Sequence, residues 1–291
     1  MITKIKKIMF MKIDLAGLKK LAIGLVVLAA FITVANEAYY WFGDSSSYDE
    51  LSEESLAEND CNVIGIELHG DLYTYLSPDN KDADGLPLVN EVASESIMGM
   101  INSAEEDENI KAILLEVDSY GGLPVAGEEV AKAMKNTTKP TVTMIRSAGT
   151  SAAYWAATGA DIIFASRNSD VGGIGVTMSY VDNVTQNKND GLTYNSLSTG
   201  KYKDYGDPNK PLTVEEKQLF QRDLNILHQN FIEAVAESRN LDIKTVAKLA
   251  DGSTMLGAMA LENGLIDRIG GIIEVNNYLK EQIGGEPEIC W

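Results

Sequence analysis

The sequence predicts an α/β fold with a parallel sheet, preceded by one membrane-spanning helix. From Cys61 onward, short runs rich in β-branched residues alternate with stretches that have the apolar spacing of amphipathic helices, which is typical of strands joined by crossover helices. Hydrophobic residues make up 45% of the 291-residue chain, enough to fill the core of one large domain. We therefore expect a cytoplasmic basic segment at 1–20, a transmembrane signal anchor at 21–42, an acidic flexible linker at 43–60 and one folded domain at 61–291.

The N-terminal segment has the composition of an export signal. Six lysines precede an apolar run at 21–35, which alone is shorter than the roughly 20 residues that a spanning helix needs. Aromatic residues at 39–42 extend the run and resemble an interfacial belt. We therefore expect an uncleaved anchor, with the lysines in the cytoplasm and everything after Phe42 on the extracytoplasmic side of the cell membrane. A removable signal peptide, cleaved near residues 33–35, is the alternative, and it exports the rest of the chain as well.

Charge and cysteine content exclude several classes of function. The net charge of -19 argues against a nucleic-acid surface, because phosphate binding needs clustered Lys and Arg. The acidic, Ser-rich stretch at 43–60 has few large apolar groups and is typical of a tether. Cys61 and Cys290 have neither a metal-ligand spacing nor a redox-motif spacing, so we expect no metal and no cofactor. They would form a disulfide in an oxidising compartment, although two separate buried thiols are the commoner state at strand edges.

The elements of the folded domain follow in order. Strands are expected at 63–68, 112–117, 141–145, 162–165 and 192–197, where short β-branched runs lie between turn residues. Helices are expected at 90–104, at 125–134, from Ser151 onward, and from 214 to about 240. Thr213 and Glu216 have the spacing of a capping box at the start of the long helix. The tail at 243–283 has a helical pattern broken by glycines.

Ser151 is the strongest candidate for a nucleophile. It lies where a strand gives way to a helix, so the positive helix end and free backbone N–H groups would favour a developing oxyanion. The simpler interpretation is that Ser151 or Thr150 only caps the helix. The chain has two histidines: His228 falls in the long helix, where a packing role is favoured, and His69 ends the first strand. Nothing in the sequence pairs either histidine with a serine, so a Ser-His-Asp triad has no support.

The order and spacing of several short motifs identify a family resemblance. The chain carries Ser-Tyr-Gly-Gly at 119–122, Thr-Ser-Ala-Ala-Tyr-Trp at 150–155, Val-Gly-Gly-Ile-Gly-Val at 171–176, Gly-Lys-Tyr-Lys-Asp at 200–204, and a later signature at 250–267. In this order they resemble the bacterial signal peptide peptidases of the SppA type, serine proteases with the Clp-protease/crotonase fold. The resemblance implies that 61–291 is a protease domain, with a repeated ββα core and a helical C-terminal part.

The resemblance also implies the roles of individual residues. Ser151 would be the nucleophile of a Ser-Lys dyad and Lys203 its general base, with Lys201 as the competing lysine. The N–H groups of Gly122 and Ala152 would form the oxyanion hole. A lysine acts as a base only when neutral, so its pKa must fall by several units from about 10.4 through burial in a water-poor cleft.

The family comparison further implies a membrane-tethered endopeptidase that assembles into a homo-oligomer and cleaves hydrophobic peptides such as released signal peptides. Serine and lysine can come from neighbouring protomers in this family. Two alternatives stay open. A catalytically impaired relative would act as a membrane-tethered assembly or binding protein, and a crotonase-like acyl-CoA enzyme would share the fold, but an exported domain would meet little CoA.

Three departures from the family pattern weaken this transfer of roles and keep the impaired alternative open. The most important is Gly173, which replaces a serine that orients the lysine, so Thr177, Ser179 or a water would have to do so. The other departures are Tyr120 in place of a proline, and Ala152 and Ala153 in place of two glycines.

Overall fold

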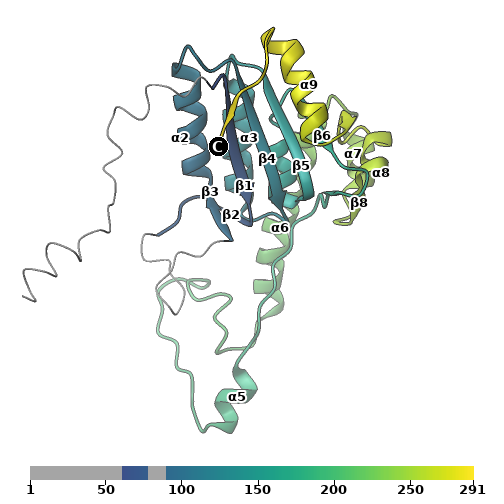
Figure 1. Ribbon diagram of the computed structural model, residues 1–291. Helices are drawn as coiled ribbons and strands as arrows, with labels where there is room; N and C mark the ends of the chain where they lie inside the picture. Colours follow the sequence, from purple (N-terminus) through teal and green to yellow (C-terminus); the bar gives the residue numbers. More distant parts are fainter. Residues whose placement is uncertain (1–60, 78–89) are drawn as a thin grey trace, which may run out of the picture. The chain divides into compact units, whose positions relative to one another are not determined.

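The computed structural model describes residues 61–77 and 90–291 (Figure 1). These residues belong to one compact unit. The basic segment, the signal anchor and the acidic linker expected at 1–20, 21–42 and 43–60 lie outside the described residues. Among the residues that are described, no helix combines the length and the apolar character needed to cross a membrane.

A central sheet organises the domain. Its main path runs in the order β10-β1-β4-β5-β6-β9, and every pairing along this path is parallel. The strands of the path are β1 (Val63–His69), β4 (Ala112–Ser119), β5 (Thr141–Thr150), β6 (Ile162–Ala165), β9 (Arg268–Ile269) and β10 (Ile289–Cys290). Off this path, β7 (Asp170–Gly172) pairs with the end of β5 in parallel and with β8 (Thr254–Leu256) in antiparallel. A separate pair joins β2 (Asp71–Tyr73) and β3 (Glu91–Ala93).

Helices cover both faces of the sheet, as Figure 1 shows. The helices are α2 (Ser94–Glu106), α3 (Pro124–Asn136), α4 (Ser151–Ala157), α5 (Val184–Asn189), α6 (Val214–Ser238), α7 (Ile243–Leu249), α8 (Gly257–Glu262) and α9 (Ile272–Ile283). Along β4, the side chains of Ile113, Leu115 and Val117 join the core beneath α2, α3 and α4. The alternate residues Ala112 and Leu114 join a second core beneath α9. This period of two confirms the predicted mixed α/β fold with a parallel sheet buried on both faces.

Most predicted elements are confirmed, and one boundary matters for the site. The strand predicted at 141–145 continues as β5 to Thr150, so it leads into α4 without an intervening loop. The predicted capping box is present at the start of α6. The Glu216 N–H donates to Thr213 Oγ1 at 3.2 Å, and the Thr213 N–H donates to Glu216 Oε2 at 2.8 Å.

The strand predicted at 192–197 is wrong. Residues 192–197 form an exposed irregular segment, and the side chain of Leu197 is 100% exposed. Alternating apolar residues become a strand only where a neighbouring edge accepts their backbone hydrogen bonds. No strand of the described domain pairs with this segment.

The two cysteines are joined by a disulfide, so the interpretation as separate buried thiols is wrong. Their Cα atoms lie 5.8 Å apart although 229 positions separate them in sequence. The parallel pairing of β10 with β1, which places Ile289 opposite Val63, brings Cys290 to the start of the first strand. The bond therefore ties the C-terminus to the edge of the sheet.

Candidate active site

Ser151 lines a cavity of about 870 Å³ at the junction of several elements. The cavity is bounded by the start of α4, the turn after β4, the segment after β7, the middle of α6 and the stretch at 250–254. Gly122, Ala152 and Gly173 are also among its lining residues. The fold thus brings together three of the motifs that the sequence spreads over more than fifty positions.

The backbone of Ser151 adopts an unusual conformation. Its φ is +53°, in the left-handed region that residues with a side chain rarely adopt. The chain turns sharply here because Thr150 is still extended, with φ -126° and ψ 160°, whereas the next residues are helical. Thr150 Oγ1 donates a hydrogen bond to the Tyr120 carbonyl at 3.0 Å, which joins this turn to the one after β4. The strained turn presents the Ser151 hydroxyl at the cavity.

Buried contacts fix α4 in place. The Tyr154 hydroxyl donates to the Leu265 carbonyl at 2.8 Å, and burial raises the pKa of Tyr154, so the phenol stays neutral. The Trp155 ring stacks on Phe231 of α6 with centroids 4.9 Å apart and planes 7° from parallel. These contacts hold the first turn of α4 as a rigid wall of the cavity.

The glycine turn after β4 lies against the serine. A Cβ on Gly121 would lie 2.7 Å from Ser151 Cβ, and one on Gly122 would lie 2.0 Å from the Leu72 carbonyl oxygen. The Leu72 N–H donates to the Gly121 carbonyl at 2.8 Å, and the Leu72 carbonyl accepts from the Leu123 N–H at 2.8 Å. In such a parallel bridge, the N–H and carbonyl of the intervening Gly122 point away from β2. Gly122 thus has an N–H directed away from β2 beside the cavity that it lines.

Gly173 lies directly beside the nucleophile turn. Its φ is +60°, and a Cβ there would lie 3.3 Å from Thr150 Cβ and 3.4 Å from the Ser151 nitrogen. Of the two hydroxyl residues considered as substitutes for the family serine, Thr177 lines the cavity. Ser179 is exposed and is not one of the lining residues.

The two lysine candidates differ in their surroundings, and neither lines the cavity. Lys203 is exposed in a series of turns, where its backbone N–H donates to the Gly200 carbonyl at 3.2 Å. Lys201 Nζ lies 2.5 Å from Glu215 Oε2, and hydrogen bonding to this carboxylate raises the pKa of Lys201. A raised pKa keeps an amine charged, which is the opposite of what a general base needs. Because Lys203 is not among the residues that line the cavity, the single chain does not bring it to Ser151.

Two ionisable residues that the sequence analysis did not assign to the site also line the cavity. His228, expected to have a packing role, lies in the wall with Gln221, Leu224 and Asn225. These four residues are three, four and seven positions apart on α6, so they lie on one face of the helix. This spacing was the feature of the sequence from which a shared position in the site could have been predicted. Asp251 also lines the cavity. Its carboxylate accepts hydrogen bonds from the Ser253 hydroxyl and N–H, which lower its pKa.

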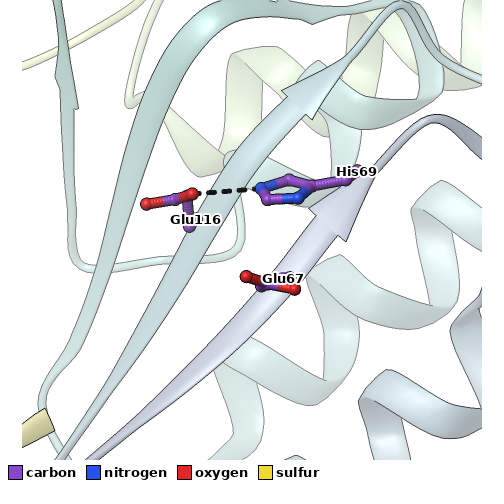
Figure 2. A group of neighbouring side chains, drawn as sticks. All are labelled: Glu67, His69 and Glu116. Carbon is purple, nitrogen blue, oxygen red and sulfur yellow. Dashed lines mark hydrogen bonds and ion pairs between the residues drawn. The ribbon is translucent and has the colours of Figure 1, made fainter. Parts of the chain in front are cut away.

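His69 belongs to a different cluster, which lies on the same sheet face as α9, beyond the second core. Figure 2 shows its ring directed at Glu116, with Glu67 beside them. His69 Nε2 lies 3.1 Å from Glu116 Oε1, and Arg146 Nη1 donates to the same oxygen at 2.8 Å. The ligand atoms of Glu67, His69 and Glu116 lie within 4.8 Å of one another, a spacing that could hold a cation. Because the Arg146 guanidinium already supplies a positive charge to Glu116, we interpret the group as an ion-pair cluster.

Comparison with known proteins gives one family match and several relatives. The sequence profile described as peptidase family S49 matches residues 133–285, a range that includes Ser151, Gly173 and Lys203. An archaeal protein from Methanocaldococcus jannaschii, provisionally named a protease, is 34% identical over 66% of this chain and 62% of its own length. A protein from Enterococcus faecium, provisionally named signal peptide peptidase SppA, is 29% identical over 80% of this chain and 68% of its own.

Two other matches are more distant. Protease 4 from Haemophilus influenzae is 28% identical over 69% of this chain, but the match spans only 33% of that protein. The chain therefore covers less than two thirds of two of these three relatives. Among solved structures, a ClpP1 mutant from Listeria monocytogenes gives a TM-score of 0.47 and 12% identity, over 71% of this chain and 91% of that one.

Proposed function

Because this chain belongs to peptidase family S49, we propose that it is a membrane-anchored serine endopeptidase that uses Ser151 as its nucleophile and Lys203 as its general base. The observation that carries the proposal is the strained Ser151 at the end of β5, at a cavity that Gly122 and Ala152 also line. The substrates are hydrophobic peptides, such as released signal peptides or fragments of membrane proteins. The name of the Enterococcus faecium relative, signal peptide peptidase, supports this substrate class.

In the proposed reaction, a neutral Lys203 amine takes the hydroxyl proton of Ser151 as its oxygen attacks a peptide carbonyl carbon. The N–H groups of Gly122 and Ala152 donate hydrogen bonds to the oxyanion. Collapse of this intermediate breaks the C–N bond, and the protonated lysine returns the proton to the departing amine. A water, deprotonated by the same lysine, then hydrolyses the acyl-serine ester and regenerates the enzyme.

Lys203 reaches Ser151 from a neighbouring copy of the chain in this proposal. Its exposure in the single chain, and its absence from the lining of the cavity, support a dyad that assembly completes. Apolar side chains of the same segment are unusually exposed: those of Val181 at 80%, Leu192 at 62% and Leu197 at 100%. A second subunit would bury them and exclude water from the amine, which lowers the pKa of a lysine.

The disulfide supports the extracytoplasmic location of the domain. Cys61–Cys290 joins β10 to the residues just before β1, and structural disulfides persist mainly in exported proteins. We propose that residues 21–42 anchor the chain, that residues 43–60 form a flexible linker, and that the domain from residue 61 onward works outside the cytoplasm.

Substitution of each member of the dyad tests the activity. With a quenched fluorescent peptide and the full chain in detergent, we expect Ser151→Ala and Lys203→Ala each to lower kcat/KM by at least about 10³-fold. Lys201→Ala is the matched control, and we expect it to stay within about threefold of the unsubstituted enzyme, because exposed ion pairs contribute little. Full turnover by either dyad variant would refute the mechanism.

Mixed assemblies test the origin of the lysine. Ser151→Ala chains and Lys203→Ala chains are each inactive alone, but a ring of both would restore about a quarter of the sites if serine and lysine come from different subunits. No recovery from a mixture whose co-assembly is verified would place both residues in one chain.

A second candidate function is a catalytically impaired assembly or binding protein. Gly173 favours it, because this position has no hydroxyl to orient a lysine and its φ of +60° disfavours a side chain. If the unsubstituted chain assembles at the membrane but cleaves no peptide in a panel of hydrophobic sequences, this alternative replaces the peptidase.

A further inference from the structure

The middle of α6 supplies one wall of the cavity that contains Ser151. Five residues of the helix line this cavity: Gln221, Leu224, Asn225, His228 and Phe231. Of these, Phe231 is only 2% exposed and belongs to the core. His228 therefore lies at the boundary between the polar wall of the cavity and its apolar base.

The imidazole of His228 has an unused hydrogen-bonding group. Its Nε2 is shielded from solvent and makes no hydrogen bond with any described residue. A buried polar atom without a partner destabilises the folded chain, whereas an apolar side chain at the same place would not. Binding sites often contain such a group, since a ligand supplies the missing partner. The terminal torsion of histidine is broad, so a small rotation turns a ring nitrogen toward the cavity.

His228 differs from the other polar residues that line the cavity. Among the described residues that line the cavity, it is the only one with a basic side chain. The carboxylate of Asp251 is already engaged by Ser253. The surfaces near the ring are apolar, with the Trp155 and Phe231 rings stacked 4.9 Å apart and Leu224 one turn away.

We propose that His228 determines specificity by binding the hydroxyl of a tyrosine on the acyl side of the cleaved bond. The carbonyl that Ser151 attacks belongs to this residue, so its side chain enters the cavity that Ser151 lines. An aromatic ring suits the apolar base. A phenol hydroxyl can donate or accept a hydrogen bond, so it satisfies either neutral tautomer of the imidazole. The inference rests on the proposed peptidase function and narrows its substrate class.

A pair of peptides that differ only in tyrosine or phenylalanine at this position provides the test. With the full chain, we expect kcat/KM to be about tenfold higher for the tyrosine peptide, because a site built to bind a hydroxyl discriminates against its absence. In His228→Phe the ratio should fall to about one while cleavage of the phenylalanine peptide continues. Gln229→Ala is the matched control, because Gln229 is exposed on α6 and does not line the cavity. A ratio of about one in the unsubstituted enzyme, or a tenfold ratio that survives in His228→Phe, overturns the inference.

A binding measurement separates this inference from the peptidase function. The chain has only two histidines, so a Ser151→Ala, His69→Gln double variant leaves His228 as the sole source of imidazole resonances. We expect the tyrosine peptide to shift these resonances more than the phenylalanine peptide does, whether or not the unsubstituted chain cleaves either one. Equal shifts from both peptides, or none from either, would exclude His228 as a contact for the hydroxyl. If the unsubstituted chain cleaves neither peptide but the tyrosine peptide still gives the larger resonance shifts in the double variant, the result counts against the peptidase function alone.

Discussion

Ser151 and Gly173 both adopt left-handed backbone conformations, but at different energetic cost. Ser151 accepts a left-handed φ of +53° despite its side chain, which costs on the order of 1–3 kcal/mol that the surrounding contacts must offset. Gly173, at φ +60°, adopts a similar conformation without that cost because it lacks a Cβ. Strain is therefore concentrated at the residue that we propose as the nucleophile.

Replacing Gly173 by serine should not simply restore the family pattern. We expect Gly173→Ser to lower the free energy of unfolding by about 1 kcal/mol, since its φ is positive and its new Cβ would crowd Thr150. Urea unfolding measures this change. Gly285→Ser is the matched control, because a Cβ at this position would have no atom within 4 Å and its φ is not in the left-handed region. Equal stability of the two variants would show that residue 173 carries no strain penalty.

At the scale of the elements, the position of α4 depends on how closely α3 approaches it. Gly127 of α3 makes this approach, since a Cβ there would lie 2.5 Å from the Ala152 carbonyl oxygen and 3.1 Å from Ala152 Cα. The same residue, Ala152, is proposed to supply an oxyanion N–H. The contact between two helices thus sets the geometry of the catalytic wall.

The same substitution should have opposite effects in two helices. Gly127→Ala should destabilise the fold by about 1–3 kcal/mol and lower kcat, because the added methyl overpacks the contact with Ala152. Gly99→Ala in α2 should stabilise it by about 0.5–1 kcal/mol, because alanine is the better helix former and no atom lies within 4 Å of this Cβ. Thermal unfolding and peptide cleavage measure both effects. A stabilised, fully active Gly127→Ala enzyme would refute the role of the close approach.

The carboxylate of Glu216 at the start of α6 should make the stability of the domain depend on pH. Lys210 and the Thr213 N–H hydrogen-bond to Glu216 and hold the pKa of this carboxyl below its ordinary value of 4.5. The folded state therefore binds the proton less tightly than the unfolded chain, so the contribution to stability is present above 4.5 and is lost as the pH falls through the folded-state pKa. We expect Glu216→Gln to be less stable than the unsubstituted chain at about pH 7, and the difference to shrink at about pH 3. A difference that does not change with pH would show that capping, and not charge, matters at this position.

For the whole molecule, the Cys61–Cys290 disulfide closes the longest loop in the described chain. It spans 229 positions and holds β10 against β1 at the sheet edge. Trp291, the residue after Cys290, packs over Gly65 of β1, where a Cβ would lie 2.5 Å from its ring. The C-terminus thus covers part of the sheet face that α9 leaves open.

Removing this bond should weaken the whole domain. We expect a Cys61→Ser, Cys290→Ser double variant to lose about 2–5 kcal/mol of unfolding free energy. Hydrogen exchange should show the first increase at β10. The double variant and the reduced form of the unsubstituted chain should agree, and a double variant of unchanged stability would contradict a structural role for the bond.

Local patterns in the sequence determined most of the elements, because strands, helices and caps depend on neighbours within a few positions. The short β-branched runs predicted β1, β4 and β6, and the pair Thr213 and Glu216 predicted the start of α6. The α/β class and the position of Ser151 at a strand–helix junction followed from the same local information.

Contacts between distant segments were decided only by the tertiary structure. The Cys61–Cys290 bond, the irregular segment at 192–197 and the placement of His228 in the cavity that Ser151 lines each depend on which faces meet. One such contact, between Tyr154 and Leu265, joins residues 111 positions apart. A residue's own neighbours in sequence carry no record of a partner so far away, because packing of the whole chain against itself selects that partner.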